Sequence, residues 1–301
     1  MTIYKTESSH AQAAEFDLRP PQEALLILAS AQAEAAAVVQ AAIPQIAQAA
    51  QIAADTITRG GRLIYAAAGS SGLMALADAL ELPGTYGIER NRVKILFAGG
   101  VAALSEMVGG PEDDGEAARD AVMALHPGPE DCLIALTASG STPYPVTALE
   151  TAKAAGARTI GMANNPDVPV LRLAEVPILL PTPAEVVAGS TRMGAGTAQK
   201  IALNMISTMM AVHLGHVYDG YMVNVVADNL KLRVRARGIV VAITSVADTV
   251  AAEALEHAGG AVKPAILIAA GAQSMDGAQA LLLRHGGHLR PALQELGGPK
   301  G

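Results

Sequence analysis

The stretch GRLIYAAAGSSG, residues 61–72, decides the fold. It joins the apolar run from Arg62 to Ala68 to a turn of glycine and serine, and residues with a helical period follow. Four later runs are of the same kind: Val93 to Ala98, Asp131 to Thr137, Arg158 to Ala163 and Val176 to Leu180. Continuous apolar strands that alternate with helices are typical of a parallel sheet with both faces buried. We therefore expect an α/β fold around a five-stranded parallel sheet.

Helices are predicted before and after this region. The segment from Pro21 to Arg59 is rich in alanine and contains no glycine, which predicts two helices, the second beginning at Pro44. From Ala195 to about Arg237, long apolar-periodic stretches without a strand signal predict helices that close the sheet domain.

The last part of the chain contains a duplication. The string GGAVKPA at 259–265 recurs as GGHLRPA at 286–292, 27 residues later. This predicts two helix-turn-helix units, in which each Gly-Gly ends one helix and each Pro lies in the first turn of the next. We expect an N-terminal helical segment at 1–58 packed on a sheet domain at 59–238, followed by a small helical domain at 239–301.

The composition argues against several classes of function. The 301 residues include 21 Lys and Arg against 28 Asp and Glu, a formal net charge of -7, with no Trp and few other aromatic residues, which disfavours a nucleic-acid partner. The sequence has no uninterrupted apolar window of about 18 residues, so no membrane span is predicted. The single cysteine, Cys132, lies in an apolar run and is expected in the core. One cysteine and the lack of an apolar leader favour a cytoplasmic location.

Three turns after predicted strands share hydroxyl and glycine residues: GSSG at 69–72, SGST at 139–142 and GSTR at 189–192. Unpaired N–H groups at a helix N-terminus, together with hydroxyls, suit a phosphate group. Ordinary N-capping is the alternative for any one turn. Because neither a P-loop nor a G-x-G-x-x-G motif is present, a small phosphorylated metabolite fits better than a nucleotide triphosphate or NAD.

Two glutamates are candidates for proton transfer. Glu81 precedes LPGTYG at 82–87, which we expect to end the helix and to place the carboxyl beside apolar side chains. Glu112 lies in the break GGPEDDG at 109–115. Two acids on irregular backbone above one sheet can act as base and acid, although capping of the next helix is the alternative for Glu112, Asp113 and Asp114. His213 and His216 are three residues apart but have no third ligand nearby, so no metal site is expected.

The sequence resembles a known family, the N-acetylmuramic acid 6-phosphate etherases. The matching segments are GRLIY (61–65), GSSG (69–72), DALELPGTYG (78–87), ASGSTPY (138–144), PAEVVAGSTRM (183–193), GTAQK (196–200) and NMIST (204–208). The last three form a signature that these enzymes share with the glucokinase regulatory protein, and the repeated tail is similar to the family's small UBA-like helical domain. The resemblance implies a sugar isomerase (SIS) fold, a three-layer αβα sandwich, usually in a homodimer with active sites near the subunit interface.

The resemblance also implies a reaction: cleavage of the D-lactyl ether of N-acetylmuramic acid 6-phosphate to N-acetylglucosamine 6-phosphate and D-lactate, with no metal or organic cofactor. A base, matching Glu112, removes the C2 proton of the open-chain aldehyde, and an acid, matching Glu81, protonates the departing lactate before water adds at C3. Leu80, Leu82 and Pro83 are expected to desolvate Glu81, and Asp113 and Asp114 to make Glu112 more basic. The implied sugar-phosphate contacts are Ser70, Ser71, Ser139, Ser141, Thr142, Glu185, Ser190, Thr191 and Arg192.

Some positions depart from the family pattern. Leu73, Ser141 and Gly194 stand where family members usually carry cations, and Ser8-Ser9 follows Thr6-Glu7 in place of an expected Arg-Asn pair. A related sugar phosphate and a substrate without the lactyl carboxylate are therefore alternative substrates, and a phosphosugar aldose–ketose isomerase is the main alternative activity. A sugar-phosphate sensor is a third, which both glutamates argue against.

Overall fold

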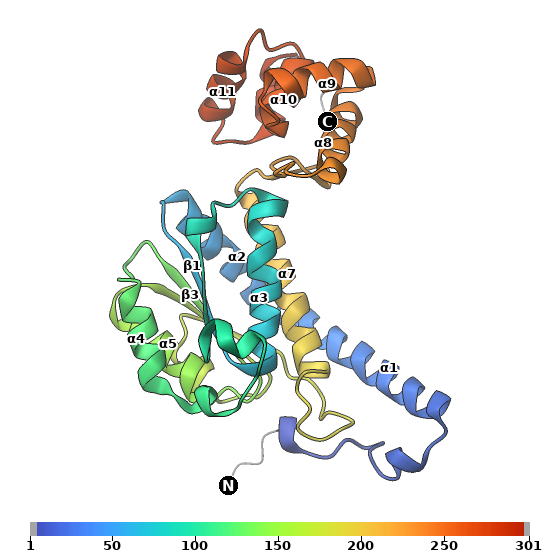
Figure 1. The fold of residues 1–301 in the computed structure, drawn as a ribbon, viewed down its shortest axis with the longest axis vertical. Coiled ribbons are helices and arrows are strands. Elements are labelled where there is room, and N and C mark those ends of the chain that lie inside the picture. The colour runs from blue at the N-terminus through green and yellow to red at the C-terminus, as the bar shows by residue number, and fades with distance from the viewer. Residues whose placement is uncertain (1–4, 298–301) are drawn as a thin grey trace. The chain divides into compact units, whose positions relative to one another are not determined.

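A five-stranded parallel sheet forms the centre of the computed structural model, which describes residues 5–297 (Figure 1). The strand order is β2-β1-β3-β4-β5. Every residue of β1 and β3 is buried, because both faces of the sheet are covered, and this explains their apolar runs without alternation. The predicted strands are confirmed as β1 Leu63–Ala67, β2 Val93–Phe97, β3 Cys132–Thr137, β4 Arg158–Ala163 and β5 Val176–Leu179.

Helices on both faces of the sheet give the three layers that the sequence predicts. On one face, Ala118 and Val122 of α4 and Leu149 of α5 pack in one cluster with Ile64 and Leu133 of the sheet. On the other face, α2 contacts the sheet beside α3 and α7 (Figure 1). The helices are α2 Ile43–Thr58, α3 Gly69–Tyr86, α4 Gly115–Ala124, α5 Pro143–Ala154, α6 Pro169–Leu173 and α7 Gly194–His213.

A buried carboxylate joins three of these elements. Asp78 of α3, 4% exposed, accepts hydrogen bonds from the hydroxyl of Tyr65 in β1 and, on its other oxygen, from Asn204 and Ser207 of α7. Burial raises the pKa of Asp78, while the three donors oppose that shift. The network therefore fixes α3 against α7 and β1.

The N-terminal helices are α1 Pro21–Ala37 and α2, joined by the short 3-10 helix η3 Val38–Ala42, and Pro44 lies in the first turn of α2 as predicted. Ile46 and Ile52 of α2 are buried, whereas α1 leaves Leu25 and Leu26 exposed. By length and composition alone, the stretch Pro21–Thr58 is apolar enough to cross a membrane. The sequence analysis predicted no span there because it required an uninterrupted apolar window, and polar residues divide this stretch. Packing against the sheet accounts for the apolar face of α2.

The C-terminal residues form a helical unit with its own core, in which Val240, Ala254 and Leu267 are buried together. The predicted duplication is confirmed. The N–H of Gly260 donates to the carbonyl of Leu255, and 27 residues later that of Gly287 donates to Leu282, so both helices end in the same way. The elements are β6 Val217–Tyr218, β7 Tyr221–Met222, α8 Leu230–Thr244, α9 Asp248–His257, α10 Val262–Ala269, α11 Met275–Arg284 and α12 Leu289–Glu295.

The chain divides into two compact units at positions other than those expected. The first unit comprises the described residues up to Ala79 together with Asn91–Thr208, and the second comprises Leu80–Arg90 with the described residues from Met209 onward. The expected boundary at 238 falls inside α8, and the hairpin β6–β7 lies where only helices were predicted. The remaining short 3-10 helices are η1 Lys5–Glu7, η2 Phe16–Leu18, η4 Arg90–Arg92, η5 Gly100–Leu104 and η6 Gly110–Asp113.

Candidate active site

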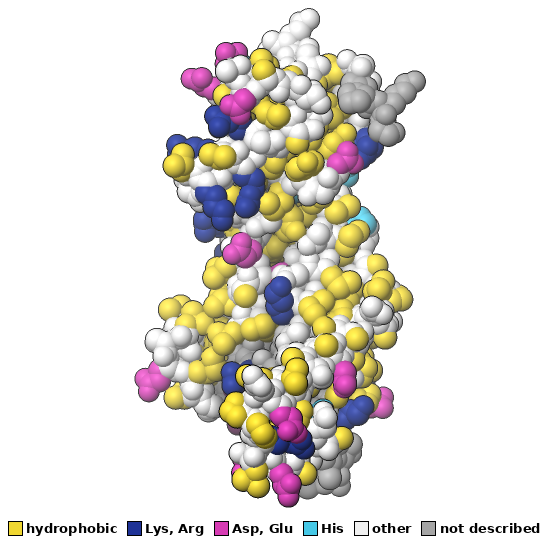
Figure 2. Space-filling model, turned by 90° about the vertical axis from the view of Figure 1, so that its right-hand side faces the viewer, with side chains coloured by type: hydrophobic (Ala, Val, Ile, Leu, Met, Phe, Trp, Pro, Cys, Tyr) yellow, Lys and Arg dark blue, Asp and Glu magenta, His cyan; other side chains and the backbone are white. Residues whose placement is uncertain are grey.

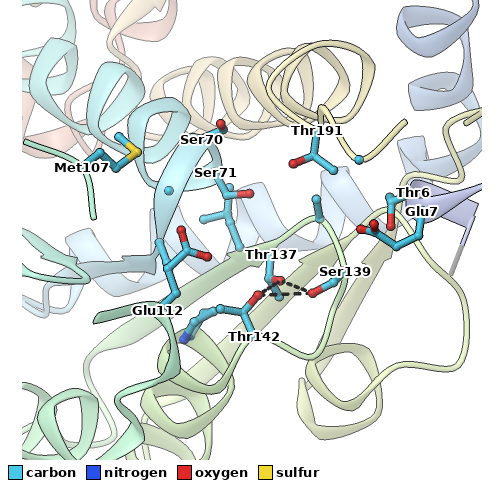
Figure 3. Close-up of a pocket in the computed structure, with 16 residues that line it drawn as sticks. Thr6, Glu7, Ser70, Ser71, Met107, Glu112, Thr137, Ser139, Thr142 and Thr191 are labelled. Atoms are coloured by element: carbon cyan, nitrogen blue, oxygen red, sulfur yellow. Dashed lines mark hydrogen bonds between the residues drawn. The ribbon is translucent and has the colours of Figure 1, made fainter. Parts of the chain in front are cut away.

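A cavity of about 270 Å³ lies in the first unit where β1 and β3 end (Figure 3). These neighbouring strands are followed by connections that lead to opposite sides of the sheet, because β2 pairs with one edge of β1 and β3 with the other. Ligands of open parallel sheets bind at such a switch point. The lining residues are Thr6, Glu7, Ala68, Gly69, Ser70, Ser71, Met107, Glu112, Leu136, Thr137, Ala138, Ser139, Thr142, Pro145, Gly189 and Thr191.

Three hydroxyls form a cluster on one wall of this cavity. Thr137 lies 2.8 Å from Thr142 and 3.2 Å from Ser139, oxygen to oxygen, and the N–H of Gly140 donates to Thr137. The turn needs glycine at 140, since φ is +81° and a Cβ would lie 2.1 Å from Val168. Pro143 and Pro145 of α5 have no N–H, so the donors that this turn offers are mainly hydroxyls rather than helical amides.

The turn after β1 supplies backbone donors. Gly69, Ser70 and Ser71 form the first turn of α3, whose N–H groups have no helical acceptor, and both serines line the cavity. Gly72 leaves room for Phe97, because a Cβ there would lie 2.5 Å from that ring. A helix N-terminus beside a hydroxyl cluster suits a phosphate monoester.

Glu112 faces the cavity from η6 (Figure 3). A Cβ built on Gly69 would lie only 2.5 Å from its Oε1, so the carboxylate rests against the start of α3. Burial raises the pKa of Glu112, and the charge of Asp113 adds to the rise. Helix capping falls instead to Asp114, which accepts from the N–H of Ala117. Glu112 thus has the surroundings of a general base.

The third predicted turn reaches the cavity only in part. Gly189 and Thr191 line it, whereas Ser190 and the exposed Arg192 do not. Glu185, 4% exposed, accepts from the N–H groups of Gly194 and Ala195, both at 2.9 Å. The structure therefore uses the Glu185 carboxylate to cap α7, and neither it nor Ser141 lines the cavity.

The predicted helix break after Glu81 is wrong. α3 continues to Tyr86 with Pro83 inside it, because the proline falls in the last turn, where only one backbone hydrogen bond is lost. Glu81 is consequently exposed on α3, about three turns beyond Ser70, and accepts at 3.4 Å from the hydroxyl of Thr85. The apolar surroundings expected for its carboxyl are not formed, and Glu81 does not line the cavity in its own chain.

Two lining residues that sequence reasoning missed come from the N-terminal segment. Thr6 and Glu7 lie beside Gly189, and buried Asn165 holds the segment by accepting from the N–H of Lys5 and donating to the hydroxyl of Thr6. The one available signal was the Thr6-Glu7 pair within the family resemblance. Among the described lining residues, Glu7 and Glu112 are the only ones with charged side chains.

Positions expected to carry cations contribute no charge here. Leu73 is partly exposed on α3, and a Cβ at Gly194 would lie 3.1 Å from Ala35 and from the Glu185 carboxylate. The described residues contain no group of three His, Cys, Asp or Glu side chains arranged to hold a metal ion.

Comparison with known proteins identifies the domain and the fold. Residues 27–164 match the SIS domain family. A solved protein of Bacteroides fragilis, described as a phosphosugar isomerase involved in capsule formation, superposes with a TM-score of 0.50 at 20% identity, over 67% of this chain and 95% of that one. This likeness supports the fold alone.

Full-length relatives are more informative. N-acetylmuramic acid 6-phosphate etherase of Deinococcus radiodurans is 43% identical over 97% of this chain and 95% of its own length. The protein named N-acetylmuramic acid 6-phosphate etherase 1 of Vibrio cholerae is 38% identical over 98% of both chains. With such identity over nearly its full length, the chain belongs to the family of N-acetylmuramic acid 6-phosphate etherases.

Proposed function

We propose that this protein is a carbon–oxygen lyase that cleaves the D-lactyl ether of N-acetylmuramic acid 6-phosphate, giving N-acetylglucosamine 6-phosphate and D-lactate. The observation that carries the proposal is the partly buried carboxylate of Glu112, held against Gly69 in a hydroxyl-lined cavity. The family membership identifies the sugar phosphate.

In the proposed reaction the phosphate lies at the first turn of α3 and the cluster of Thr137, Ser139 and Thr142. Glu112 removes the proton from C2 of the open-chain sugar, which the neighbouring aldehyde acidifies. The raised pKa makes Glu112 a stronger base than an ordinary glutamate. The C3–O bond breaks with its electron pair on the lactate oxygen, which takes a proton. Water then adds at C3, and C2 regains a proton.

The acid in this scheme is Glu81, delivered by a second copy of the chain. Glu81 does not line the cavity of its own chain, and its exposed carboxyl neighbours Leu80, which is 62% exposed. Leu73, Ala77 and Leu80 follow one another at helical spacing on the exposed face of α3. Hydrophobic side chains are also exposed on the face of the molecule that Figure 2 shows. Leu25 and Leu26 of α1 are 63% and 69% exposed. We propose a homodimer, because such apolar surface favours association.

Release of D-lactate from purified protein and N-acetylmuramic acid 6-phosphate tests the activity, and a protein that releases none contradicts it. Glu112→Gln should abolish solvent deuterium exchange at C2, whereas Glu81→Gln should retain exchange and lose lactate release. Mixing these two inactive variants tests the shared site. Random pairing of two-fold dimers restores about a quarter of wild-type activity only if the two glutamates come from different copies.

An aldose–ketose isomerase remains the second candidate, since the described residues lining the cavity include no cation to pair with a lactyl carboxylate. Both reactions begin with loss of the C2 proton, so their products separate them: a ketose phosphate without lactate favours isomerisation.

A cytoplasmic location belongs to the proposal and is supported by the single, buried Cys132. Cell fractionation tests it.

A further inference from the structure

The N-terminal segment forms one wall of the cavity, on the side away from Glu112. Figure 3 shows Thr6 and Glu7 on one side and Glu112 on the other, with the cluster of Thr137, Ser139 and Thr142 between them. The proposed reaction gives no role to Glu7, although its carboxylate is one of two charged groups in the described lining.

The segment is held firmly at this place. Thr6 is 2% exposed, and its hydroxyl accepts from Asn165, which also donates to the carbonyl of Ala138 in the turn after β3. The N–H of Lys5 donates to the same asparagine, and the N–H of Gly189 donates to the carbonyl of Thr6. One buried amide therefore ties the N-terminal segment to the turn that carries Ser139.

The carboxylate of Glu7 is available to a ligand. Among the residues that the structure describes, it has no hydrogen-bond or ion-pair partner. It lies against Gly189, where a Cβ would be 3.3 Å from Oε2 and where φ is +75°, so a side chain at 189 would crowd it. An ionised carboxylate accepts hydrogen bonds and repels anions. The part of a ligand that meets Glu7 must therefore be a hydrogen-bond donor and not an anion, and the hydroxyl groups of a sugar are such donors.

We propose that Glu7 is a specificity-determining residue that accepts hydrogen bonds from the hydroxyl groups of the open-chain sugar. This inference rests on the proposed function for the identity of the sugar phosphate. With the phosphate at the hydroxyl cluster and Glu112 at C2, Glu7 binds hydroxyls on the other side of the cavity. Its charge also turns the lactyl carboxylate away from the N-terminal segment, which fixes one orientation of the substrate.

Binding measurements on Glu7→Ala and Glu7→Gln test this role by calorimetry, with N-acetylglucosamine 6-phosphate and inorganic phosphate as separate probes. Loss of a charged hydrogen-bond acceptor should weaken binding of the sugar phosphate roughly ten- to a hundredfold in Glu7→Ala. Glu7→Gln retains an acceptor oxygen and should recover part of the loss. Inorganic phosphate should bind equally well or more tightly to both variants, because a negative charge has been removed.

The control is Glu15→Ala, which removes an exposed glutamate from the same segment outside the cavity. It should bind both probes as the wild type does. Equal weakening of both probes in Glu7→Ala would indicate a merely structural role and overturn the proposal, as would unchanged binding of the sugar phosphate. Lactate release by the wild type is measured alongside. If the wild type releases none, the proposed function fails, while the two binding probes still decide the role of Glu7.

Discussion

Gly69 lets the Glu112 carboxylate rest against the start of α3, and Gly69→Ala perturbs that arrangement directly. The new Cβ would lie 2.5 Å from Oε1 of Glu112, so the carboxylate has to retreat by roughly 1 Å to reach van der Waals contact. A misplacement of about 1 Å at a reacting group can cost on the order of 10²-fold in rate. Because φ at Gly69 is +52°, alanine also adds about 1–2 kcal/mol of backbone strain.

We expect kcat/KM for lactate release to fall about 10²-fold in Gly69→Ala, with a thermal midpoint only a few degrees lower. C2 deuterium exchange should fall with it, because the displaced group is the base. Gly100→Ala is the matched control: φ there is +65° and no atom lies within 4 Å of a Cβ, so it adds strain without touching Glu112. The reasoning is refuted if folded Gly69→Ala keeps wild-type exchange, or if Gly100→Ala loses as much activity.

Three further predictions concern charged groups. Asp113→Asn should lower the pKa of Glu112 and move the acidic limb of the kcat/KM profile to lower pH, while burial, the larger cause of the raised pKa, stays in place; an unmoved limb contradicts this. Glu185→Ala leaves two buried N–H groups at the start of α7 without their acceptor, and urea unfolding should show a loss of at least about 2 kcal/mol. Burial lowers the pKa of Lys263 to about 8, so the folded protein releases a proton that the unfolded chain keeps up to about pH 10.5. Its stability should therefore rise across that window relative to Lys263→Met, by up to roughly 3 kcal/mol, and parallel pH curves for the two proteins would argue against it.

Local sequence patterns were sufficient for most of the fold. β1 and β3 are buried along their whole length, so their residues are almost all apolar, and each is followed by a turn rich in glycine and serine. The two Gly-Gly pairs are predictable for a similar reason, because Gly260 and Gly287 adopt a positive φ that ends a helix. Glu112 was a candidate because it lies in an irregular segment after the second strand, but this pattern left helix capping open, and the role of base came from the family resemblance.

Features that depend on distant contacts were not predictable in this way. Glu7 reaches the cavity only because Asn165, about 160 residues away, holds its neighbours. Glu185 looks like a binding residue within its motif, yet its partners are amides nine and ten residues further on. Pro83 signals a break, but it lies in the last turn of α3, where a proline removes only one backbone hydrogen bond.

Cys132 lies at the start of the fully buried β3 and is the chain's single thiol. Burial raises its pKa to about 12, so in the folded protein it is both shielded and protonated. An alkylating reagent can therefore reach it only after the middle strand has separated from its neighbours. The rate at which Cys132 is alkylated therefore measures how often the sheet opens, and it can be followed in the wild-type protein without an engineered label.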